Sequence, residues 1–136
     1  SVAIASSYVA PTSNEDIVWS YLIESGFTRE QSAGIMGNLQ QEHRFRTDGD
    51  GLAQWLDGRL NKLLALPNAR DINVQVKYLV DEMNSTEVYA GNLVRSAATI
   101  EDATVLFQNK FERCNPQYCM QSQRIAYAYE FYERYK

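Results

Sequence analysis

The sequence predicts a single, mostly α-helical domain with one irregular excursion. The chain has 136 residues, which suits one compact domain with its own hydrophobic core. Apolar residues make up 45% and charged residues 22%, the balance of an ordinary globular protein. Apolar residues recur at helical spacing in about six to seven segments, and no stretch alternates strongly enough to predict a strand.

The first thirteen residues do not share this periodicity. They are mostly small, include a proline at position 11, and lack the basic start of an intact signal peptide. We expect residues 1–13 to be a lead-in, either a linker from a larger chain or the remainder of a removed signal. Residues 14–136 then form the folded domain.

A first helix is expected from about Ser13 or Asn14, with acidic residues in its first turn and Gly26 as a C-terminal cap. Thr28 and Gln31 have the spacing of a capping box, which predicts a second helix to about Gln41.

Two glycines, Gly34 and Gly37, fall inside the second helix. Each costs a helix about 1 kcal/mol relative to alanine. We therefore expect another element to pack closely against the helix at these positions.

The turn-forming residues between Arg44 and Gly51 predict a loop or a small β-hairpin. The helical pattern then resumes. Five further helices are expected, over about 59–66, 71–83, 87–97, 99–111 and 122–135.

The charge pattern restricts the choice of partner. The formal net charge is −4 and no basic stripe is present, which argues against nucleic acid. No apolar run is long enough to predict a membrane span. A neutral or weakly charged polymer is compatible with this surface.

Cys114 and Cys119, four residues apart around an Asn-Pro turn, are either joined by a local disulfide or remain two free thiols. A disulfide would indicate an extracytoplasmic setting. His43 is the single histidine and is remote in sequence, so we expect no metal site.

Glu42 carries the clearest chemical signal. It would lie at the C-terminal end of a buried helix, where both the helix dipole and burial disfavour a negative charge. A carboxylic acid that keeps its proton is what the cleavage of a glycosidic bond requires. The plainer alternative is a solvated surface charge. Likewise, Trp55 could be a core anchor, and Asp48 and Asp50 could be loop-forming or cation-binding residues.

The segments around Glu42 resemble the phage tail lysozyme family, a branch of the lysozyme-like superfamily. The resemblance rests on residues 34–39 (Gly-Ile-Met-Gly-Asn-Leu), Glu42, Phe45, residues 51–55 (Gly-Leu-Ala-Gln-Trp) and Gly58-Arg59. Residues 14–19, 26–28 and 107–113 (Phe-Gln-Asn-Lys-Phe-Glu-Arg) resemble the family's opening and a later segment.

This resemblance implies a small, mostly helical lysozyme-like domain with a cleft beside the loop, and it makes Glu42 the catalytic acid. Gln54 and Trp55 would contact substrate or support the orientation of the acid. His43 stands where the family often has serine. It could tune Glu42, or it could be an exposed residue favoured by the helix end.

The resemblance also implies a second carboxylate near the loop. Asp50 is the first choice, followed by Asp48 and then Asp57. We also expect Asp48 and His43 to take part in substrate binding.

The implied substrate is peptidoglycan, cut at the β-1,4 bond between N-acetylmuramic acid and N-acetylglucosamine without a metal or cofactor. The alternatives are a lytic transglycosylase that forms 1,6-anhydro products, and a non-catalytic wall-binding or structural tail module. We expect an extracytoplasmic location, either in a virion tail together with other tail proteins or as a secreted enzyme.

Overall fold

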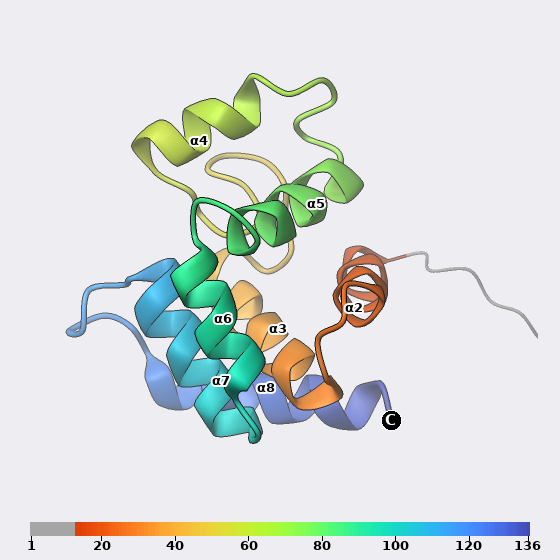
Figure 1. The fold of residues 1–136 in the computed structure, drawn as a ribbon, viewed down its shortest axis with the longest axis vertical. Coiled ribbons are helices and arrows are strands. Elements are labelled where there is room, and N and C mark those ends of the chain that lie inside the picture. Colours follow the sequence, from red (N-terminus) through yellow and green to blue (C-terminus); the bar gives the residue numbers. More distant parts are fainter. Residues whose placement is uncertain (1–12) are drawn as a thin grey trace, which may run out of the picture.

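The computed structural model describes residues 13–136, and the predicted lead-in falls, apart from Ser13, outside this range. Within residues 13–136 there are seven α-helices, one π-helical segment and no strand, which confirms the mostly α fold class (Figure 1). The elements are α2 (Asn14–Glu24), α3 (Arg29–His43), α4 (Asp57–Leu64), α5 (Ile72–Met83), α6 (Val88–Ser96), α7 (Ile100–Leu106), η1 (Phe107–Glu112) and α8 (Gln121–Arg134).

Side-chain caps fix where several helices begin. The predicted capping box of α3 is present: the Gln31 amide donates to Thr28 Oγ1 at 3.1 Å, and the Thr28 amide donates to Gln31 Oε1 at 3.0 Å. The helix continues past its expected end near Gln41 to His43, and Arg44 follows in the left-handed conformation. This extension keeps Glu42 inside the helix.

Two expectations need correction. The segment from Arg44 to Leu56 is an irregular loop, so the β-hairpin alternative is wrong. The helix expected over residues 99–111 is divided into α7 and the π-helical η1, where the Arg113 amide donates to the Gln108 carbonyl at 2.9 Å. A π-helical turn contains an extra residue, which a 3.6-residue periodicity does not reveal.

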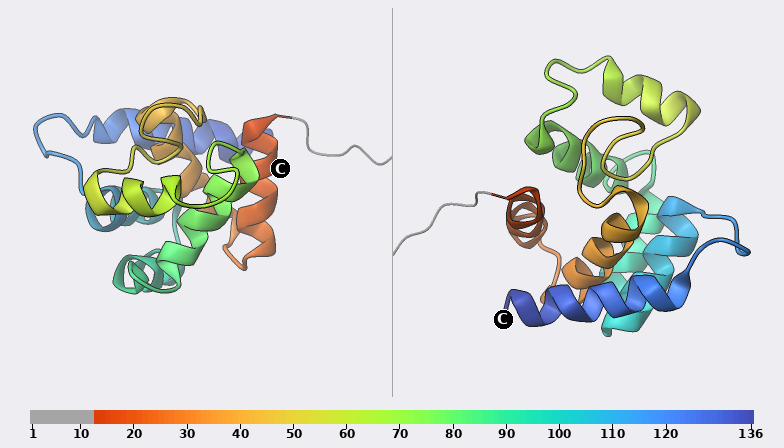
Figure 2. Two further views of the ribbon diagram at one scale, coloured as in Figure 1. Left: turned by 90° about the horizontal axis from the view of Figure 1, so that it is seen from above. Right: turned by 180° about the vertical axis from the view of Figure 1, so that it is seen from behind.

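Helix α3 is the central element, and its residues from Gln31 to Leu39 are all buried. It packs against α7 and α8, which lie on the side of the molecule away from α4 (Figures 1 and 2). A side chain at Gly34 would lie 2.7 Å from the Thr104 amide of α7, and one at Gly37 would lie 2.8 Å from the Ala128 amide of α8. The expected close packing at both glycines is confirmed.

The loop, α4 and α5 lie toward the end of the molecule opposite α8 (Figures 1 and 2). Gln75 of α5 holds the loop in place: its Oε1 accepts from the Leu52 amide at 2.8 Å, and its Nε2 donates to the Thr47 carbonyl at 2.9 Å. The C-terminal end of α3 leads directly into this loop, so Glu42 lies where the two parts of the molecule meet. No helix in residues 13–136 is long and apolar enough to cross a membrane.

Candidate active site

Glu42 occupies a rigid position at the end of α3. After it the chain turns sharply, with Arg44 and Phe45 both in the left-handed conformation. The Phe45 ring is buried against Phe131, with ring centroids 5.4 Å apart. The backbone carbonyl of Phe45 accepts a hydrogen bond from Asn14 Nδ2 at 2.9 Å. Glu42 is thus held by α3 on one side and by an anchored turn on the other, with its side chain 15% exposed.

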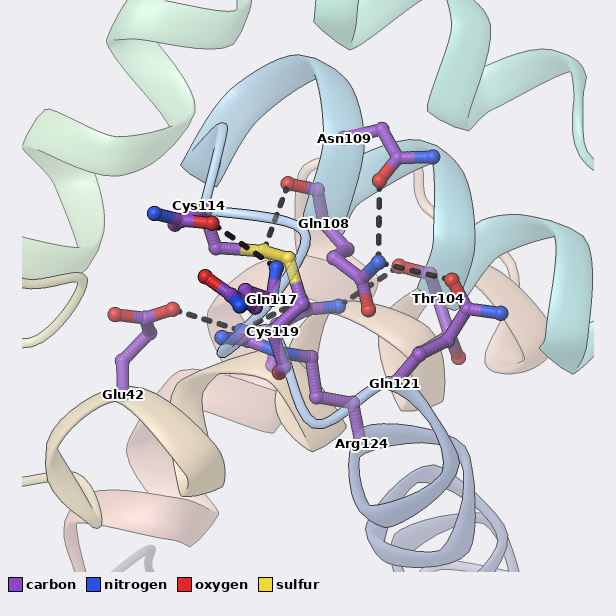
Figure 3. The surroundings of a disulfide bond; sticks show 11 residues. Glu42, Thr104, Gln108, Asn109, Cys114, Gln117, Cys119, Gln121 and Arg124 are labelled. Atoms are coloured by element: carbon purple, nitrogen blue, oxygen red, sulfur yellow. Dashed lines mark hydrogen bonds and ion pairs between the residues drawn. A yellow bond between two sulfur atoms is a disulfide. The ribbon is translucent and has the colours of Figure 1, made fainter.

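The partner of Glu42 is Arg124 of α8, which the sequence did not predict. Arg124 Nη1 lies 2.7 Å from Glu42 Oε2, and the arginine side chain is only 4% exposed (Figure 3). Arg124 also donates from Nη1 to Asn38 Oδ1 at 3.0 Å and from Nε to the Cys119 carbonyl at 2.6 Å. These contacts fix the guanidinium directly in front of the acid.

A disulfide joins Cys114 and Cys119, which settles the alternative left open by the sequence (Figure 3). Its short ring supplies the Cys119 carbonyl that binds Arg124. The covalent link therefore supports the side chain that faces the acid, and it favours an extracytoplasmic or virion setting.

Burial is the main influence on the protonation of Glu42 and raises the pKa of its carboxyl group. The charge of Arg124 and its hydrogen bond act in the opposite direction, but the pKa of Glu42 remains above its ordinary value. A carboxyl group in this position keeps its proton to higher pH than an exposed glutamate, as a general acid must.

A second buried carboxyl group, that of Glu112, lies at the end of η1. Its Oε2 is buried and has no hydrogen-bond partner among the described residues. Burial, and next the negative charge of Glu42, raise the pKa of Glu112 well above its ordinary value. In the sequence, Glu112 stands out only as part of residues 107–113, which resemble a later segment of the family.

An open cavity of about 550 Å³ lies beside these groups, within the size range of ligand sites. Glu42 does not line this cavity, but Gln54 connects Glu42 to it. Gln54 lines the cavity, and its Nε2 lies 3.4 Å from the backbone carbonyl of Glu42. The loop, α4, α5, the α5–α6 turn and the end of η1 contribute the lining residues: Gln54, Leu56, Asp57, Gly58, Arg59, Lys62, Tyr78, Glu82, Thr86, Glu87, Glu112 and Arg113.

Trp55 is a core residue, 1% exposed, and its Nε1 donates to Glu82 Oε1 at 2.7 Å. Its ring packs edge-on against Tyr78, with centroids 5.1 Å apart. Its indole presents no free face to a sugar. This position is that of the core anchor, the plainer alternative that the sequence left open for Trp55.

The aspartates proposed from the sequence lie in different surroundings. Asp48 is exposed and paired with His43, with 2.7 Å between Oδ1 and Nε2, and this hydrogen bond lowers the pKa of Asp48. Asp50 is half-buried, and its carbonyl accepts from the Trp55 amide at 2.8 Å. Asp57 is exposed at the cavity. The structure thus brings His43 and Asp48 together, and it brings Gln54 to Glu42.

A helical domain whose central helix ends in a buried acid, beside a loop and an open cavity, has the architecture of a lysozyme-like, peptidoglycan-degrading protein. The chain matches the family model of phage tail lysozyme over residues 13–135, and it belongs to that family. No curated protein and no solved structure matches the chain. Membership of the family confirms the resemblance seen in the sequence and implies an activity on peptidoglycan.

Proposed function

We propose that the protein is a muramidase that cleaves the β-1,4 bond between N-acetylmuramic acid and N-acetylglucosamine, with Glu42 as the general acid. The observation that carries this proposal is the position of Glu42: a carboxyl group at the buried end of α3, with a raised pKa, next to Gln54 at the cavity. This combination matches the requirements of an acid that protonates a glycosidic oxygen.

In the proposed reaction, protonated Glu42 donates to the glycosidic oxygen as the bond from that oxygen to C1 of the muramic acid breaks. Positive charge then develops on the muramic acid ring. Water adds to C1 and gives up a proton to a carboxylate. Asp50 is the sequence-based candidate for this second group, with Asp48 and Asp57 after it. We propose Gln54, Asp48 and His43 as substrate contacts.

A lytic transglycosylase is the alternative within the same site. There the 6-hydroxyl of the muramic acid attacks C1 in place of water and leaves a 1,6-anhydro end. The two reactions require the same acid, so the geometry of Glu42 does not separate them, whereas their products do.

The deciding experiment is mass spectrometry of fragments released from purified sacculi by the wild-type protein, by Glu42→Gln and by Glu24→Gln. Glu24 is a matched control because it is an exposed glutamate at the C-terminal end of α2. Reducing ends from the wild type and from the control, but not from Glu42→Gln, would support the muramidase. Anhydro ends would show the transglycosylase instead. Full cleavage by Glu42→Gln, or none by the wild type, would refute Glu42 as the acid or the enzyme itself.

For Asp50, the test is a single substitution to asparagine. If Asp50 accepts the proton from water, Asp50→Asn loses most of its turnover, while Asp48→Asn and Asp57→Asn keep theirs. Turnover unchanged in Asp50→Asn would move the role of second carboxylate to another residue.

The site of action follows from the substrate. The family and the disulfide favour a place outside the cytoplasmic membrane. We propose a virion tail that opens the wall locally, with other tail proteins as partners. Detection of the chain in purified particles by mass spectrometry would test this location, and its recovery only as a free secreted protein would contradict it.

A further inference from the structure

The two carboxyl oxygens of Glu42 have different surroundings. Arg124 Nη1 lies 2.7 Å from Oε2. Among residues 13–136 no donor reaches Oε1, and Figure 3 shows this oxygen pointing away from Arg124. A neutral carboxyl group has one oxygen that accepts and one that carries the proton, and a guanidinium can only donate. The pairing therefore makes Oε2 the acceptor and leaves Oε1 to carry the proton.

The guanidinium of Arg124 is held in place by neutral groups as well as by Glu42. Its Nε donates to the Cys119 carbonyl at 2.6 Å, and its Nη1 donates to Asn38 Oδ1 at 3.0 Å. The buried Asn38 amide is itself oriented, because its Nδ2 donates to the Thr104 carbonyl of α7 at 3.0 Å. These contacts do not depend on the protonation state of Glu42, so the cation is already in position before the acid loses its proton.

A fixed guanidinium binds a carboxylate more strongly than a neutral carboxyl group, because only the carboxylate adds charge attraction, and this attraction is strong in a site sheltered from water. An interaction that strengthens as the proton leaves stabilises the transition state more than the resting state. Burial raises the pKa of Glu42, and the charge and hydrogen bond of Arg124 lower it by less. Glu42 thus rests in its protonated form but can release the proton.

We propose that Arg124 is the positioning residue of the acid: it binds Oε2 of Glu42, so that Oε1 presents the proton to the glycosidic oxygen, and it stabilises the carboxylate that forms as the proton leaves. The contacts from Cys119 and Asn38 hold it in readiness for that step.

This proposal rests on the proposed function and deepens it. The glycosidic oxygen takes the proton from Oε1 and keeps the electron pair of its bond to C1, which breaks. Glu42 is then a carboxylate bound to Arg124. Water adds its hydroxyl group to C1 and releases a proton, and Glu42 regains one proton, so the cycle balances.

Other titratable groups near the acid are common to every variant of Arg124. Glu112 of η1 senses the charge of Glu42, and His43, next to it in α3, is bound to Asp48 of the loop at 2.7 Å. Because these groups do not change, a difference between variants in the pH dependence of cleavage reports the loss of Arg124.

The test is kcat for soluble glycan fragments as a function of pH, which reports the acid in the enzyme–substrate complex. In Arg124→Gln, kcat below the alkaline limb should fall about 100-fold. The alkaline limb should move up by about one pH unit, because Glu42 loses the cation that favours its ionised form. A purely structural arginine would lower the rate equally at all pH values. An unmoved limb, or one moved to lower pH, would overturn the proposal.

Arg29→Gln is the matched control. Arg29 also joins α3 to α8, since its Nη2 donates to the Tyr132 carbonyl at 3.2 Å, but it lies about 20 Å from Glu42 along the helix. This variant should keep the wild-type limb. A limb that moves equally in both arginine variants would assign the effect to loosened packing of α8, against the proposal.

Arg124→Lys separates charge from geometry and decides the matter if Arg124→Gln does not fold. An ammonium group keeps the charge but lacks the planar fork that binds Glu42, Asn38 and the Cys119 carbonyl together. The limb should stay near its wild-type position, with kcat lowered and KM unchanged. A wild-type kcat in Arg124→Lys would refute a positioning role.

An NMR titration of the Glu42 carboxyl carbon without substrate distinguishes failure of this proposal from failure of the proposed function. The midpoint should be higher in Arg124→Gln than in the wild type. An unchanged midpoint with an active wild type would refute this proposal alone. A wild type that cleaves no glycan would refute the proposed function, and the catalytic part of this proposal with it, whatever the midpoint.

Discussion

The molecule contains two buried arginine–glutamate pairs that differ in how fully the carboxylate is bound. Glu82 is 3% exposed and accepts hydrogen bonds from Trp55 Nε1 at 2.7 Å, Arg59 Nε at 2.8 Å and Arg59 Nη2 at 2.9 Å. Glu42 is 15% exposed, and Arg124 is its side-chain partner.

The difference separates a structural carboxylate from one that is available for chemistry. Three donors saturate the Glu82–Arg59 pair and tie the loop, α4 and α5 together. The Glu42–Arg124 pair leaves acceptor capacity free on the acid. Glu112, at the cavity, has one buried carboxyl oxygen without a hydrogen-bond partner among the described residues. Bound donors stabilise an ionised carboxylate, while a general acid must exist in its protonated form.

The largest expected effect tests the catalytic side of this comparison. Glu42→Gln should lower the rate of glycan cleavage about 100- to 10,000-fold, because glutamine cannot donate the proton. Its stability should fall by less than about 2 kcal/mol, since the glutamine oxygen still accepts from Arg124. Turbidity loss of a sacculus suspension and urea unfolding measure the two quantities. A large loss of stability with little loss of rate would reverse the roles of the two pairs.

Glu82→Ala tests the structural side. The free energy of unfolding should fall by about 3–5 kcal/mol, because the substitution leaves Trp55 Nε1 and the Arg59 guanidinium without their acceptor. Glu42→Ala should lose less than half as much, and urea unfolding of both variants gives the comparison. Equal losses would show that the number of bound donors does not distinguish the pairs.

The pH dependence of stability should come from the carboxyl groups of Glu42 and Glu112. The pKa values of both carboxyl groups are raised in the folded protein. Their contribution to stability is therefore fully present below the ordinary pKa of glutamate and is lost as the pH rises through the raised values. In urea unfolding from acid to neutral pH, the free energy of unfolding of the wild type should fall relative to that of Glu112→Gln as the pH rises. A rise of the wild-type value relative to Glu112→Gln would contradict the sign.

The smallest effect is expected at the exposed pair of His43 and Asp48. Asp48 has a side chain that is 77% exposed, so the substitution Asp48→Ala should leave the stability nearly unchanged. Thermal unfolding measures this change. Should Asp48→Ala raise KM for soluble glycan fragments without changing kcat, the pair takes part in substrate binding, as we expect from the sequence.

The sequence predicted the helices well because caps and apolar periodicity are local properties. The capping box at Thr28 and the close approach at Gly34 and Gly37 were both correct. Glu42 could be singled out because it ends a buried helix inside a segment that resembles the family. These features are all contained in short stretches of chain.

Arg124 and Glu112 could not be found in the same way. Arg124 reaches Asn38 across 86 positions of sequence, a contact that only the packing of α8 on α3 creates. Glu112 is the last residue of a π-helical turn, which leaves no trace in the periodicity. Electrostatic partners of a buried acid thus depend on tertiary packing, which one sequence does not specify.

The crossing of α3 and α8 at Gly37 also bears on the order of folding. Contacts between residues far apart in sequence must overcome the entropy of closing a long loop, so they form late. A chain with α3 formed and α8 undocked has no cation in front of Glu42, and its acid is solvated like any surface glutamate. If Glu42 is the acid, the burial that raises its pKa is complete only when α8 docks, and a chain with α8 undocked should not cleave the wall.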